Sequence, residues 1–599
     1  MSDTHTIEHT LKKFWGYDSF FPLQKQAADC AVEGRDSVVV LPTGGGKSLC
    51  FQVPAMVLPG LAVVVSPLIS LMKDQVDALC DYGIPAARFD STLSYGDQKA
   101  VRSSIQKGKL KLLYLSPERL VSVEFIDILK TIDLSLFAID EAHCISQWGH
   151  NFRPEYRELG LLRETFPGIS IHGYTATATE KVRSDIARQL RLKDPVMIVG
   201  SFDRPNLVYK VERRSNVMKQ VCAVLDKHKN ESGVIYCIRR ADVDDMYGSL
   251  KVFGYNVVPY HAGMDSRERQ KNQDAFIEEK VDTIVATVAF GMGIDKSNIR
   301  YIIHSGMPKS LEHYHQETGR AGRDNLEADC HLFFTGGDYG IWRSILSDLD
   351  SEAKEINEQK LNKMYEFCTK FVCRHNTILQ YFGQIPEKDN CAACDVCLGD
   401  FDHLEDSLIT AQKILSCIKR LDERFGADYT TLVLIGSHEQ RIIGNGHDSL
   451  STYGMLSDFP KRIVRDWIEQ LVSTGYIKKT DDYNVLTVTE KGWDVLKGTV
   501  SPRLLKPAEK PAKISQIAID SWEHVDKKLF EELRKVRRRI ADKKNVPAYI
   551  VFGDATLRDM ARVKPLTPES FLTVHGVGEV KSGQYCDIFV AAIRDYCGD

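Results

Sequence analysis

The sequence has no hydrophobic run long enough to cross a membrane. Its longest apolar stretches, such as Leu61 to Val65, are far shorter than the roughly 20 residues that a spanning helix requires. The opening residues, MSDTHTIEHT, are polar and lack the basic stretch and apolar core of a signal peptide. We therefore expect an intracellular, cytoplasmic protein that has no membrane partner.

An excess of basic residues is also missing. Among 599 residues, 78 Lys and Arg stand against 82 Asp and Glu, which gives a formal net charge of -4. That balance does not by itself indicate nucleic-acid binding, so such a function must rest on local groups of basic side chains. Internal repeats and low-complexity tracts are absent too. The composition is ordinary for a globular protein, and the length suggests about three to six domains.

Buried apolar strands alternate with helical stretches in two successive series. The first series contains Ser37–Leu41, Leu61–Val65, Leu112–Leu115 and Leu136–Ile139. The second contains Gly233–Cys237, Asn256–Tyr260, Thr283–Thr287 and Tyr301–His304. Continuous apolar strands separated by helices indicate parallel sheets that are covered on both faces. We therefore predict two tandem α/β domains, residues 1–200 and 201–345.

The rest of the chain divides into four segments. Residues 346–404 are helical and charged and include a cysteine cluster, whereas residues 405–500 suggest short helices followed by a pair of strands. A linker rich in Pro and Lys at 501–520 precedes a final helical module at 521–599.

Four of the 15 cysteines are spaced like metal ligands. They are Cys373, Cys391, Cys394 and Cys397. Two consecutive C-x-x-C turns and one more distant thiol supply four soft ligands, which are typical of a closed, structural Zn²⁺ site. Cys368 is a competing ligand, although a buried helix residue is the simpler interpretation, and we treat His375 as a bystander.

A glycine-rich segment follows the first predicted strand and precedes a helix. Its phosphate-binding candidates are Thr43, Gly44, Gly45, Gly46, Lys47 and Ser48. Glycines permit unusual backbone angles, so successive amides can point at phosphate oxygens, and the helix N-terminus adds a favourable partial charge. Lys47 would neutralise the β- and γ-phosphates of ATP, and Ser48 would hold Mg²⁺. Leu41 stands where the first glycine of the general pattern would be.

Other nucleotide-site candidates lie on either side of this segment. Asp140 and Glu141 end the fourth apolar run, where Asp140 suits Mg²⁺ coordination and Glu141 suits orientation of the attacking water. A solvated acidic turn is the alternative. Upstream, Gln24 has the donors and acceptor to read an adenine edge, and Tyr17 could stack on its face. A hydrophobic cluster that caps a helix is the alternative there.

These motifs and several others, in the same order, resemble the RecQ family of superfamily-two helicases. The matching stretches are TGGGKS (43–48), VSPLISLMKDQ (65–75), SPERL (116–120), DEAH (140–143), ISQWGH (145–150), TATA (175–178), ATVAFGMGIDK (286–296) and QETGRAGRD (316–324). The resemblance covers nearly the whole chain. It implies two RecA-like domains, nucleotide contacts from Gly291 and Asp295, and 3′-to-5′ DNA unwinding driven by ATP. Roles in repair, recombination, replication and the SOS response are also implied.

The last of these stretches has a direct physical interpretation. Gln316, Arg320 and Arg323 recur at about helical spacing, and arginine can clamp the charge that develops on a γ-phosphate. If the second α/β domain faces the first, Arg320 and Arg323 are arginine-finger candidates. A salt-bridged surface helix is the alternative.

The segment from Ser146 to Tyr156 resembles the aromatic-rich loop of the family. Trp148, Phe152 and Arg153 offer stacking and cation–π groups for single-stranded bases. Because the loop follows the acidic pair directly, it could report DNA binding to the ATPase centre. A hydrophobic plug between domains is the alternative.

Residues 405–500 resemble the winged-helix module of the family. Lys461, Arg462 and Arg465 lie on a predicted helix and would contact duplex phosphates without reading sequence. An amphipathic helix with solvated basic residues is the alternative.

The final module resembles the helicase-and-RNase-D C-terminal (HRDC) domain. Tyr549 could stack a base, and the basic run from Arg534 to Arg539 could contact phosphates of a single strand. A solvated helix face beside a core tyrosine is the alternative.

Three residues depart from the family pattern. Phe21 stands where an Arg usually helps to hold adenine, Asn151 replaces an Asp of the aromatic-rich loop, and Arg239 replaces a common Ser. Phe21 can stack but cannot make the contacts of that Arg. None of the three changes removes a group that hydrolysis needs, although each bears on coupling.

The combined prediction is an ATP-dependent DNA helicase that uses ATP, Mg²⁺ and Zn²⁺. Its expected partners are single-stranded and duplex DNA, with single-strand-binding protein as a further candidate, and we expect a monomer at the bacterial nucleoid. Two alternatives stay open. An RNA helicase also fits the DEAH motif, although the zinc, winged-helix and HRDC series argues against it. An ATP-gated protein that anneals or stabilises junctions without unwinding is the other.

Overall fold

The computed structural model describes residues 6–149, 152–291, 296–399, 401–480, 485–507, 515, 520–544 and 546–598. The chain forms two compact units, each discontinuous in sequence. Unit 1 comprises Met1–Leu361, Ile378–Glu387 and Ile517–Asp599, and unit 2 comprises Asn362–Thr377 and Lys388–Gln516. Among the described helices, none combines the length and the apolar character that crossing a lipid bilayer would take.

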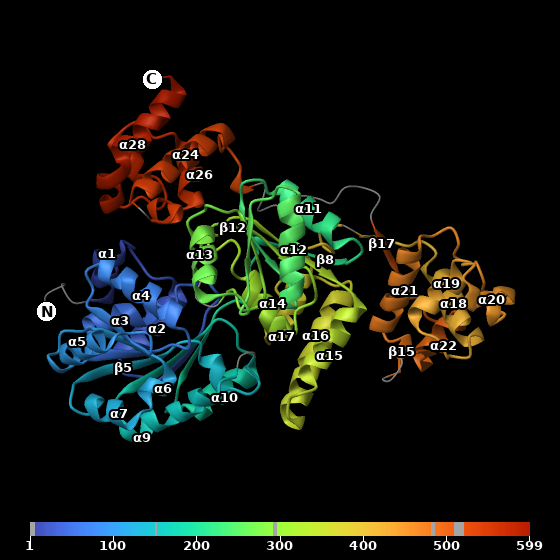
Figure 1. Cartoon of the computed structure of the whole chain (residues 1–599), viewed down its shortest axis with the longest axis horizontal. Coiled ribbons are helices and arrows are strands. Elements are labelled where there is room, and N and C mark those ends of the chain that lie inside the picture. The colour runs from blue at the N-terminus through green and yellow to red at the C-terminus, as the bar shows by residue number, and fades with distance from the viewer. Residues whose placement is uncertain are drawn as a thin grey trace. The chain divides into compact units, whose positions relative to one another are not determined.

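A seven-stranded parallel sheet forms the first α/β domain of unit 1 (Figure 1). Its spatial order is β3 (Ala86–Phe89), β4 (Leu112–Leu115), β2 (Leu61–Val65), β5 (Leu134–Ile139), β6 (Ser170–Thr175), β1 (Ser37–Val40) and β7 (Val196–Val199). The accompanying helices are α1 (Ile7–Trp15), α2 (Pro22–Val32), α3 (Leu49–Val57), α4 (Ile69–Asp81), α5 (Tyr95–Gln106), α6 (Pro117–Leu120), α7 (Val123–Leu129), α8 (Pro154–Arg157), α9 (Leu161–Thr165) and α10 (Glu180–Gln189).

Helices cover both faces of this sheet, and for that reason β1, β2 and β4 are buried at every position. Tyr174 of β6 belongs to the core that α2, α3 and α4 form on one face. Its neighbour Gly173 faces the other way, and a Cβ added there would lie 3.1 Å from Ile186 of α10. The apolar runs of the sequence therefore report a sheet buried on two sides.

A six-stranded parallel sheet forms the second α/β domain. Its order is β10 (Val257–Tyr260), β11 (Thr283–Ala286), β9 (Ser232–Tyr236), β12 (Ile299–His304), β13 (Ala328–Phe334) and β8 (Leu207–Arg213). Its helices are α11 (Val217–Lys227), α12 (Arg240–Val252), α13 (Ser266–Ile277), α14 (Leu311–Thr318) and α15 (Gly336–Leu346). The predicted pair of parallel-sheet domains is confirmed.

The apolar-run pattern did not reveal β3, β6, β7, β8 and β13. Two of these strands carry polar side chains that find partners far away in the sequence. His172 of β6 is within 2.9 Å of the Ser37 hydroxyl, and Asp329 of β13 is within 3.0 Å of His228. Buried polar groups are tolerated where they are hydrogen-bonded, so such strands lack a continuous apolar signature.

The C-terminal part of unit 1 is a helical domain with its own hydrophobic core. It contains α24 (Lys527–Lys544), α25 (Ala548–Val551), α26 (Asp554–Val563), α27 (Pro568–Leu572) and α28 (Glu579–Cys597). Two further helices, α16 (Ser351–Thr369) and α17 (Arg374–Tyr381), each run across a division between the units.

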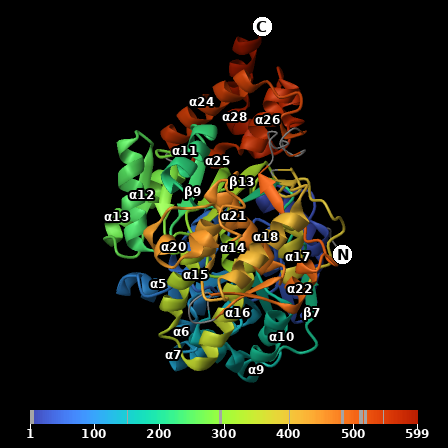
Figure 2. The same cartoon turned by 90° about the vertical axis from the view of Figure 1, so that its right-hand side faces the viewer.

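Unit 2 is built on a helical cluster (Figure 2). It also has a small antiparallel strand pair. Its elements are α18 (Ser407–Arg420), α19 (Ala427–Leu434), α20 (Gln440–Gly444), α21 (Lys461–Ser473), β15 (Ile477–Lys479), β16 (Leu486–Val488) and α22 (Glu490–Leu496). A second short pair joins β14 (Phe401–His403) to β17 (Leu505–Pro507). Trp467 of α21 is fully buried in the core, and its Nε1 donates a hydrogen bond to the Leu505 carbonyl at 3.0 Å.

We expect Trp467→Ala to lower the free energy of unfolding of unit 2 by about 3–5 kcal/mol, because a large buried ring leaves a cavity. Trp467→Phe is the milder variant, since it keeps one aromatic ring in the core and loses the pyrrole part together with the hydrogen bond to Leu505, at a cost of about 1–2 kcal/mol. Urea unfolding followed by circular dichroism measures both. Equal losses for the two variants would show that packing of the ring is not the source of the stability.

Candidate functional site

The glycine-rich segment forms a loop between β1 and α3, as its sequence predicts. Gly44 and Gly46 have φ angles of +81° and +67°, in the left-handed region that favours glycine. A Cβ at Gly46 would lie 2.4 Å from Nε2 of Gln24, so a side chain at this position would displace the Gln24 amide. Leu41, at the place of the first glycine, is buried in the core of the sheet instead.

Lys47 and Ser48 follow these glycines at the start of α3. The Lys47 ammonium donates to the carbonyl oxygens of Leu41 at 3.2 Å and Pro42 at 3.3 Å. Burial lowers the pKa of Lys47, and the nearby charges of Glu141 and Asp140 oppose that shift. The Ser48 hydroxyl accepts a hydrogen bond from Gln75 of α4 at 3.3 Å. The Lys47 ammonium thus donates to loop carbonyls. Phosphate oxygens could replace these carbonyls as its acceptors.

The acidic pair lies at the carboxyl end of β5, at the same edge of the parallel sheet. Asp140 is 7% exposed, and burial and the adjacent charge of Glu141 raise its pKa to about 7. Glu141 has a φ of +47° and lies 3.2 Å from Nδ1 of His143. Burial disfavours its charge, but the hydrogen bond and charge of His143 hold the pKa of Glu141 below its ordinary value. His143 in turn lies 2.8 Å from the Thr175 hydroxyl at the end of β6.

Gln24 is positioned by the start of α2. Its Oε1 accepts a hydrogen bond from the Phe21 amide at 3.0 Å, and its Nε2 donates to the Gly45 carbonyl at 3.0 Å. Gln24 is 6% exposed, whereas Tyr17 is 57% and Phe21 is 72% exposed. The Gln24 amide therefore bridges α2 and the phosphate loop, and the nearby sequence supplies two exposed rings, of which Phe21 brings no charge.

The second α/β domain brings its two arginines to this loop. A Cβ at Gly44 would lie 3.3 Å from Cγ of Arg323, so the side chain of Arg323 packs directly on the phosphate loop. Arg320 is 6% exposed and donates to the Gly291 carbonyl. Its charge also helps to lower the pKa of Glu141. Sequence spacing therefore found two cations that converge on the same site as Lys47.

The structure places two of the three other candidate site residues of the second domain. Gln316 is 9% exposed and lies on α14, the helix that leads to these arginines. Gly291 has a φ of +152°, and the guanidinium of Arg320 would lie within 2.7 Å of a Cβ there. Asp295 is outside the described residues.

Arg204, which precedes β8, is a site residue that sequence reasoning missed. Its Nη1 donates to the carbonyls of Thr43 at 3.2 Å and Gly319 at 3.3 Å. Its Nη2 donates to those of Ala321 at 3.1 Å and Gly322 at 2.9 Å. One guanidinium thus joins the phosphate loop to the segment that carries the arginines. No local spacing signals this role, because every partner is a backbone carbonyl remote in sequence.

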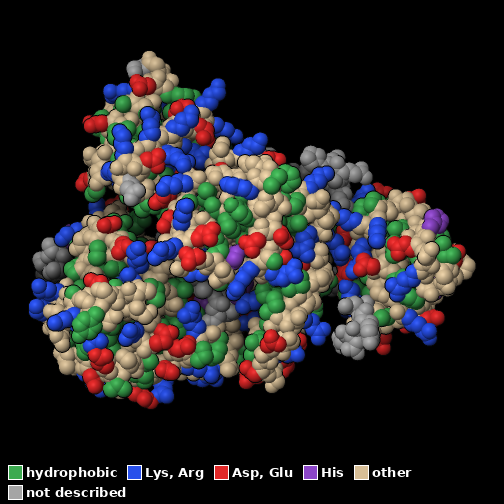
Figure 3. Space-filling model, in the orientation of Figure 1, with side chains coloured by type: hydrophobic (Ala, Val, Ile, Leu, Met, Phe, Trp, Pro, Cys, Tyr) green, Lys and Arg blue, Asp and Glu red, His purple; other side chains and the backbone are tan. Residues whose placement is uncertain are grey.

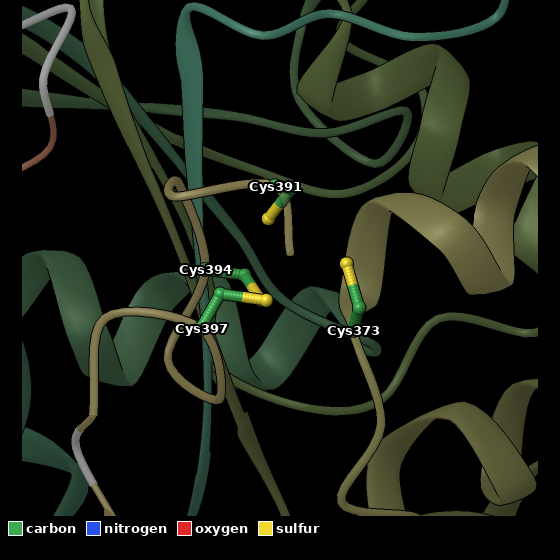
Figure 4. A group of neighbouring side chains, drawn as sticks. All are labelled: Cys373, Cys391, Cys394 and Cys397. Atoms are coloured by element: carbon green, nitrogen blue, oxygen red, sulfur yellow. The ribbon is translucent and has the colours of Figure 1, made fainter. Parts of the chain in front are cut away.

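The four predicted metal ligands come together in unit 2 (Figure 4). The sulfur atoms of Cys373, Cys391, Cys394 and Cys397 all lie within 4.8 Å of one another. Figure 4 shows three of them on one looped segment and Cys373 opposite, with the sulfurs directed at a common centre. A tetrahedron with Zn–S bonds of about 2.3 Å has edges of about 3.8 Å, so this donor set fits Zn²⁺. Neither Cys368 nor His375 belongs to the cluster found among the described residues.

A buried ion pair supports the cysteine cluster. Arg374 follows Cys373 and donates from Nε and Nη2 to the two carboxylate oxygens of Asp395, both at 2.9 Å. Asp395 follows Cys394, so the pair ties the two ligand-bearing segments together. Such a bidentate contact adds fixed geometry as well as energy.

Comparison with known proteins decides the family. The family models that match are, in chain order, the DEAD/DEAH box helicase (residues 21–185), the helicase conserved C-terminal domain (216–325), RecQ zinc-binding (336–398), the RQC domain (403–513) and the HRDC domain (526–593). The ATP-dependent DNA helicase RecQ of Pasteurella multocida is 42% identical over 99% of this chain and 94% of its own length.

The ATP-dependent DNA helicase RecQ of Bacillus subtilis is 40% identical over 99% of each chain. A protein of Acanthamoeba polyphaga mimivirus, called putative ATP-dependent RNA helicase R290, is 35% identical over 81% of this chain and 91% of its own length. The chain belongs to the RecQ family. The predicted resemblance is confirmed, and with it the succession of two RecA-like, zinc-binding, RQC and HRDC domains.

The aromatic-rich loop of this RecQ-family chain is anchored by backbone contacts. Arg153 donates to the Pro67 carbonyl at 3.1 Å, and Lys360 of α16 donates to the carbonyls of Trp148 and Gly149 at 2.6 Å and 2.8 Å. The Trp148 ring has the ammonium of Lys181 at 4.1 Å from its centroid. Sequence reasoning missed Lys360, which is remote from the loop in the chain.

Phe152 also has a cationic neighbour, since the guanidinium of Arg157 lies 4.9 Å from its ring centroid. Both predicted stacking rings therefore lie beside cations that could meet phosphates of a strand. Asn151 is outside the described residues, and Arg239 forms an ion pair with Asp242 at 2.7 Å.

The predicted DNA contacts of the winged helix lie on α21. Lys461 and Arg462 are exposed in its first turn. Arg465 is engaged inside the unit instead, donating from Nε to Asp428 at 2.8 Å and pairing with Glu469. Lys479 also binds Glu469 at 2.7 Å. The structure thus favours a structural role for Arg465. On the face drawn in Figure 3, basic and acidic side chains are interspersed rather than gathered in one patch.

We expect Cys394→Ser to lose its zinc to a chelator under conditions in which the native chain keeps about one zinc ion, because three thiolates hold the metal less tightly than four. The region around the cluster should unfold with it. Cys80→Ser, at an exposed cysteine outside the cluster, is the control. Zinc released by denaturation is measured with a chromogenic chelator. Full retention of zinc by Cys394→Ser would contradict the assigned ligand set.

Arg204→Lys should lower the kcat of DNA-stimulated ATP hydrolysis by about tenfold and leave KM for ATP nearly unchanged, since an ammonium cannot bridge four carbonyls. Arg188→Lys, at a side chain that is 67% exposed, is the control. Steady-state ATPase assays at saturating single-stranded DNA measure both constants. An unchanged kcat would mean that the bridge is not needed for hydrolysis.

Proposed function

We propose that this chain couples ATP hydrolysis to the unwinding of duplex DNA, and that it moves 3′ to 5′ along one strand. As a RecQ-family protein it is an ATP-dependent DNA helicase, whereas the direction of travel is inferred from the family resemblance alone. The observation that carries the proposal is the convergence of Lys47, Asp140 and Glu141 of the first RecA-like domain with Arg320 and Arg323 of the second.

The chain's own groups suggest a division of labour in hydrolysis. Lys47 would exchange the carbonyls of Leu41 and Pro42 for phosphate oxygens, Glu141 would orient the attacking water, and the two arginines would stabilise charge on the γ-phosphate. His143 would hold Glu141 in place through the contact described above.

Ser48 and Asp140 fit a Mg²⁺ ion at this site. Asp140 is a buried carboxylate whose charge is disfavoured, and a divalent cation would remove that penalty. When bound, Mg²⁺ would supply positive charge that offsets the charge of the phosphates.

On the DNA side, the proposal relies on two groups of residues. Trp148 and Phe152 would stack bases of the tracking strand, and Arg153 would link that loop to the motif that contains Pro67. Lys461 and Arg462 would contact duplex phosphates near the junction. We further propose a monomer that acts on DNA in the bacterial cytoplasm and meets single-strand-binding protein there, with roles in repair, recombination and replication.

An unwinding assay with three substrates tests the proposal. Duplexes with a 3′ tail, a 5′ tail, or a 3′ tail in RNA are offered to the native chain and to Lys47→Ala. We expect separation of the 3′-tailed DNA alone, and a loss of at least about 100-fold in Lys47→Ala because the phosphate charge is left unbalanced. Lys99→Ala, at an exposed lysine of the same domain, is the matched control.

Each alternative predicts a different result in this assay. Strong ATPase activity without strand separation would favour an annealing or junction-stabilising protein. Separation of the RNA-tailed substrate would favour an RNA helicase, and separation of the 5′-tailed DNA alone would overturn the proposed direction.

A further inference from the structure

A carboxylate of the second RecA-like domain is held by the HRDC domain. Glu327, which directly precedes β13, accepts hydrogen bonds from Nη1 and Nη2 of Arg558 at 2.9 Å and 3.1 Å. The Ser521 hydroxyl and the Trp522 indole also donate to it, at 2.6 Å and 2.9 Å. Four donors from one domain therefore converge on a single carboxylate of another. A two-pronged contact of this kind is among the stronger polar interactions in proteins.

Arg558 is fixed for this contact. It is 3% exposed, and its guanidinium lies 3.8 Å from the centroid of the Trp522 ring. Stacking on an aromatic ring leaves the edge of the guanidinium free to point at an acceptor. The HRDC domain thus presents a preformed receptor for a planar anion, and Glu327 fills it.

A second contact uses the basic run that the sequence suggested for DNA. Arg538 donates to the Glu279 carbonyl at 2.7 Å, and Arg534 donates to the Asn230 carbonyl at 2.9 Å. The Glu279 carboxylate lies 3.8 Å from Nη2 of Arg537. Arg534 and Arg538 of α24 therefore each contact a backbone carbonyl of the second RecA-like domain, although Arg538 itself stays exposed.

Tyr549 belongs to the same surface. The ammonium of Lys296 lies 5.5 Å from the centroid of its ring. The predicted stacking face of the HRDC domain is consequently directed at a basic residue of the second RecA-like domain.

The docked carboxylate belongs to the segment that bears the arginine fingers. We call residues 319–327 the finger loop, because it begins at the end of α14, contains Arg320 and Arg323, and ends at Glu327. Arg300 of β12 donates to both carboxylate oxygens of Asp324 at 2.6 Å and to the Glu327 carbonyl at 3.1 Å. Arg300 thus links Glu327 to Asp324, the residue after Arg323. A contact that fixes Glu327 therefore also restrains the backbone beside Arg323.

Four described side chains of unit 1 hold the finger loop. Arg204 binds carbonyls at its start, and Asn206 donates to the carbonyls of Gly322 at 2.9 Å and Leu326 at 2.8 Å. Arg300 binds its middle, and Arg558 binds its last side chain. Among these, only Arg558 comes from a domain that resembles a nucleic-acid-binding module.

We propose that the HRDC domain docks on the second RecA-like domain through Arg558 and Glu327, and that this docking positions the finger loop for hydrolysis. The inference rests on the proposed role of Arg320 and Arg323. Glu327 is a positioning residue, since it acts on the γ-phosphate site only through the loop.

The same surface predicts a competition with DNA. Arginine forks bind phosphate as readily as carboxylate, and Arg534, Arg538 and Arg558 are engaged while the domain is docked. A single strand that takes these groups must displace Glu327. Occupation of the HRDC domain by DNA and docking on the finger loop are then mutually exclusive.

A double-mutant cycle on the full chain tests the proposal, with Glu327→Ala, Arg558→Ala and the double variant. We expect each single variant to lower kcat for ATP by about threefold to tenfold at saturating DNA, with KM for ATP changed less than about twofold. The double variant should match the single variants, because each change breaks the same contact.

Affinity for a dT oligonucleotide gives a readout that a structural role would not move. Glu327→Ala should bind the oligonucleotide about threefold more tightly, because it frees Arg558, whereas Arg558→Ala should bind it more weakly because it loses a phosphate contact. Glu268→Gln, at an exposed carboxylate of α13, is the control. Hydrogen exchange of α26 and of the finger loop reports docking directly, and should rise in both single variants.

The outcomes separate docking from the proposed hydrolysis. Unchanged exchange and unchanged DNA affinity in Glu327→Ala would overturn the docking. Released docking with an unchanged kcat would overturn its positioning role. Normal kcat in Arg323→Ala would instead contradict the proposed arginine finger, whatever exchange shows. If Arg558→Ala fails to fold, Glu327→Ala still tests the docking. The Glu327 side chain is partly exposed, so its loss leaves the hydrophobic cores intact.

Discussion

The contact on which the nucleotide site depends is the one between Arg204 and four backbone carbonyls. These carbonyls belong to Thr43 of the phosphate loop and to Gly319, Ala321 and Gly322 of the finger loop. A guanidinium remains charged at any physiological pH and presents its donors in a fixed plane. This plane ties the two loops to each other directly. The loop proposed to bind phosphate and the loop that carries the proposed arginine fingers therefore share one anchor.

Sequence reasoning found the parts of the site whose chemistry is local. Glycines that need positive φ, the Lys47–Ser48 pair, the acidic pair at a strand end and the cysteine spacing each occupy a few consecutive residues. Such patterns follow from backbone sterics and ligand geometry, which a short segment can carry by itself. The two parallel sheets could be predicted for a similar reason, since central strands buried on both faces are continuously apolar.

What the sequence did not reveal are single charged residues with distant partners. Arg204, Lys360 and Glu327 have no motif, because backbone carbonyls or another domain complete their contacts. β6 and β13 were missed for a related reason, since the polar residues His172 and Asp329 are hydrogen-bonded to residues remote in the sequence. Basic residues such as Arg465 show the converse. Their spacing suggested DNA, but they are engaged with carboxylates of their own unit.

The path of the chain through the cysteine cluster has a consequence for stability. Cys373 and Cys391 belong to unit 2, but the segment between them, Ile378–Glu387, belongs to unit 1. There Gln384 donates to the Gly200 carbonyl and accepts from the Phe202 amide, both at 2.9 Å. Closing the thiolate cluster therefore closes a chain loop between Cys373 and Cys391, and the middle of that loop packs in unit 1. Loss of the metal would therefore loosen a segment that packs in unit 1 as well as the cysteine cluster itself.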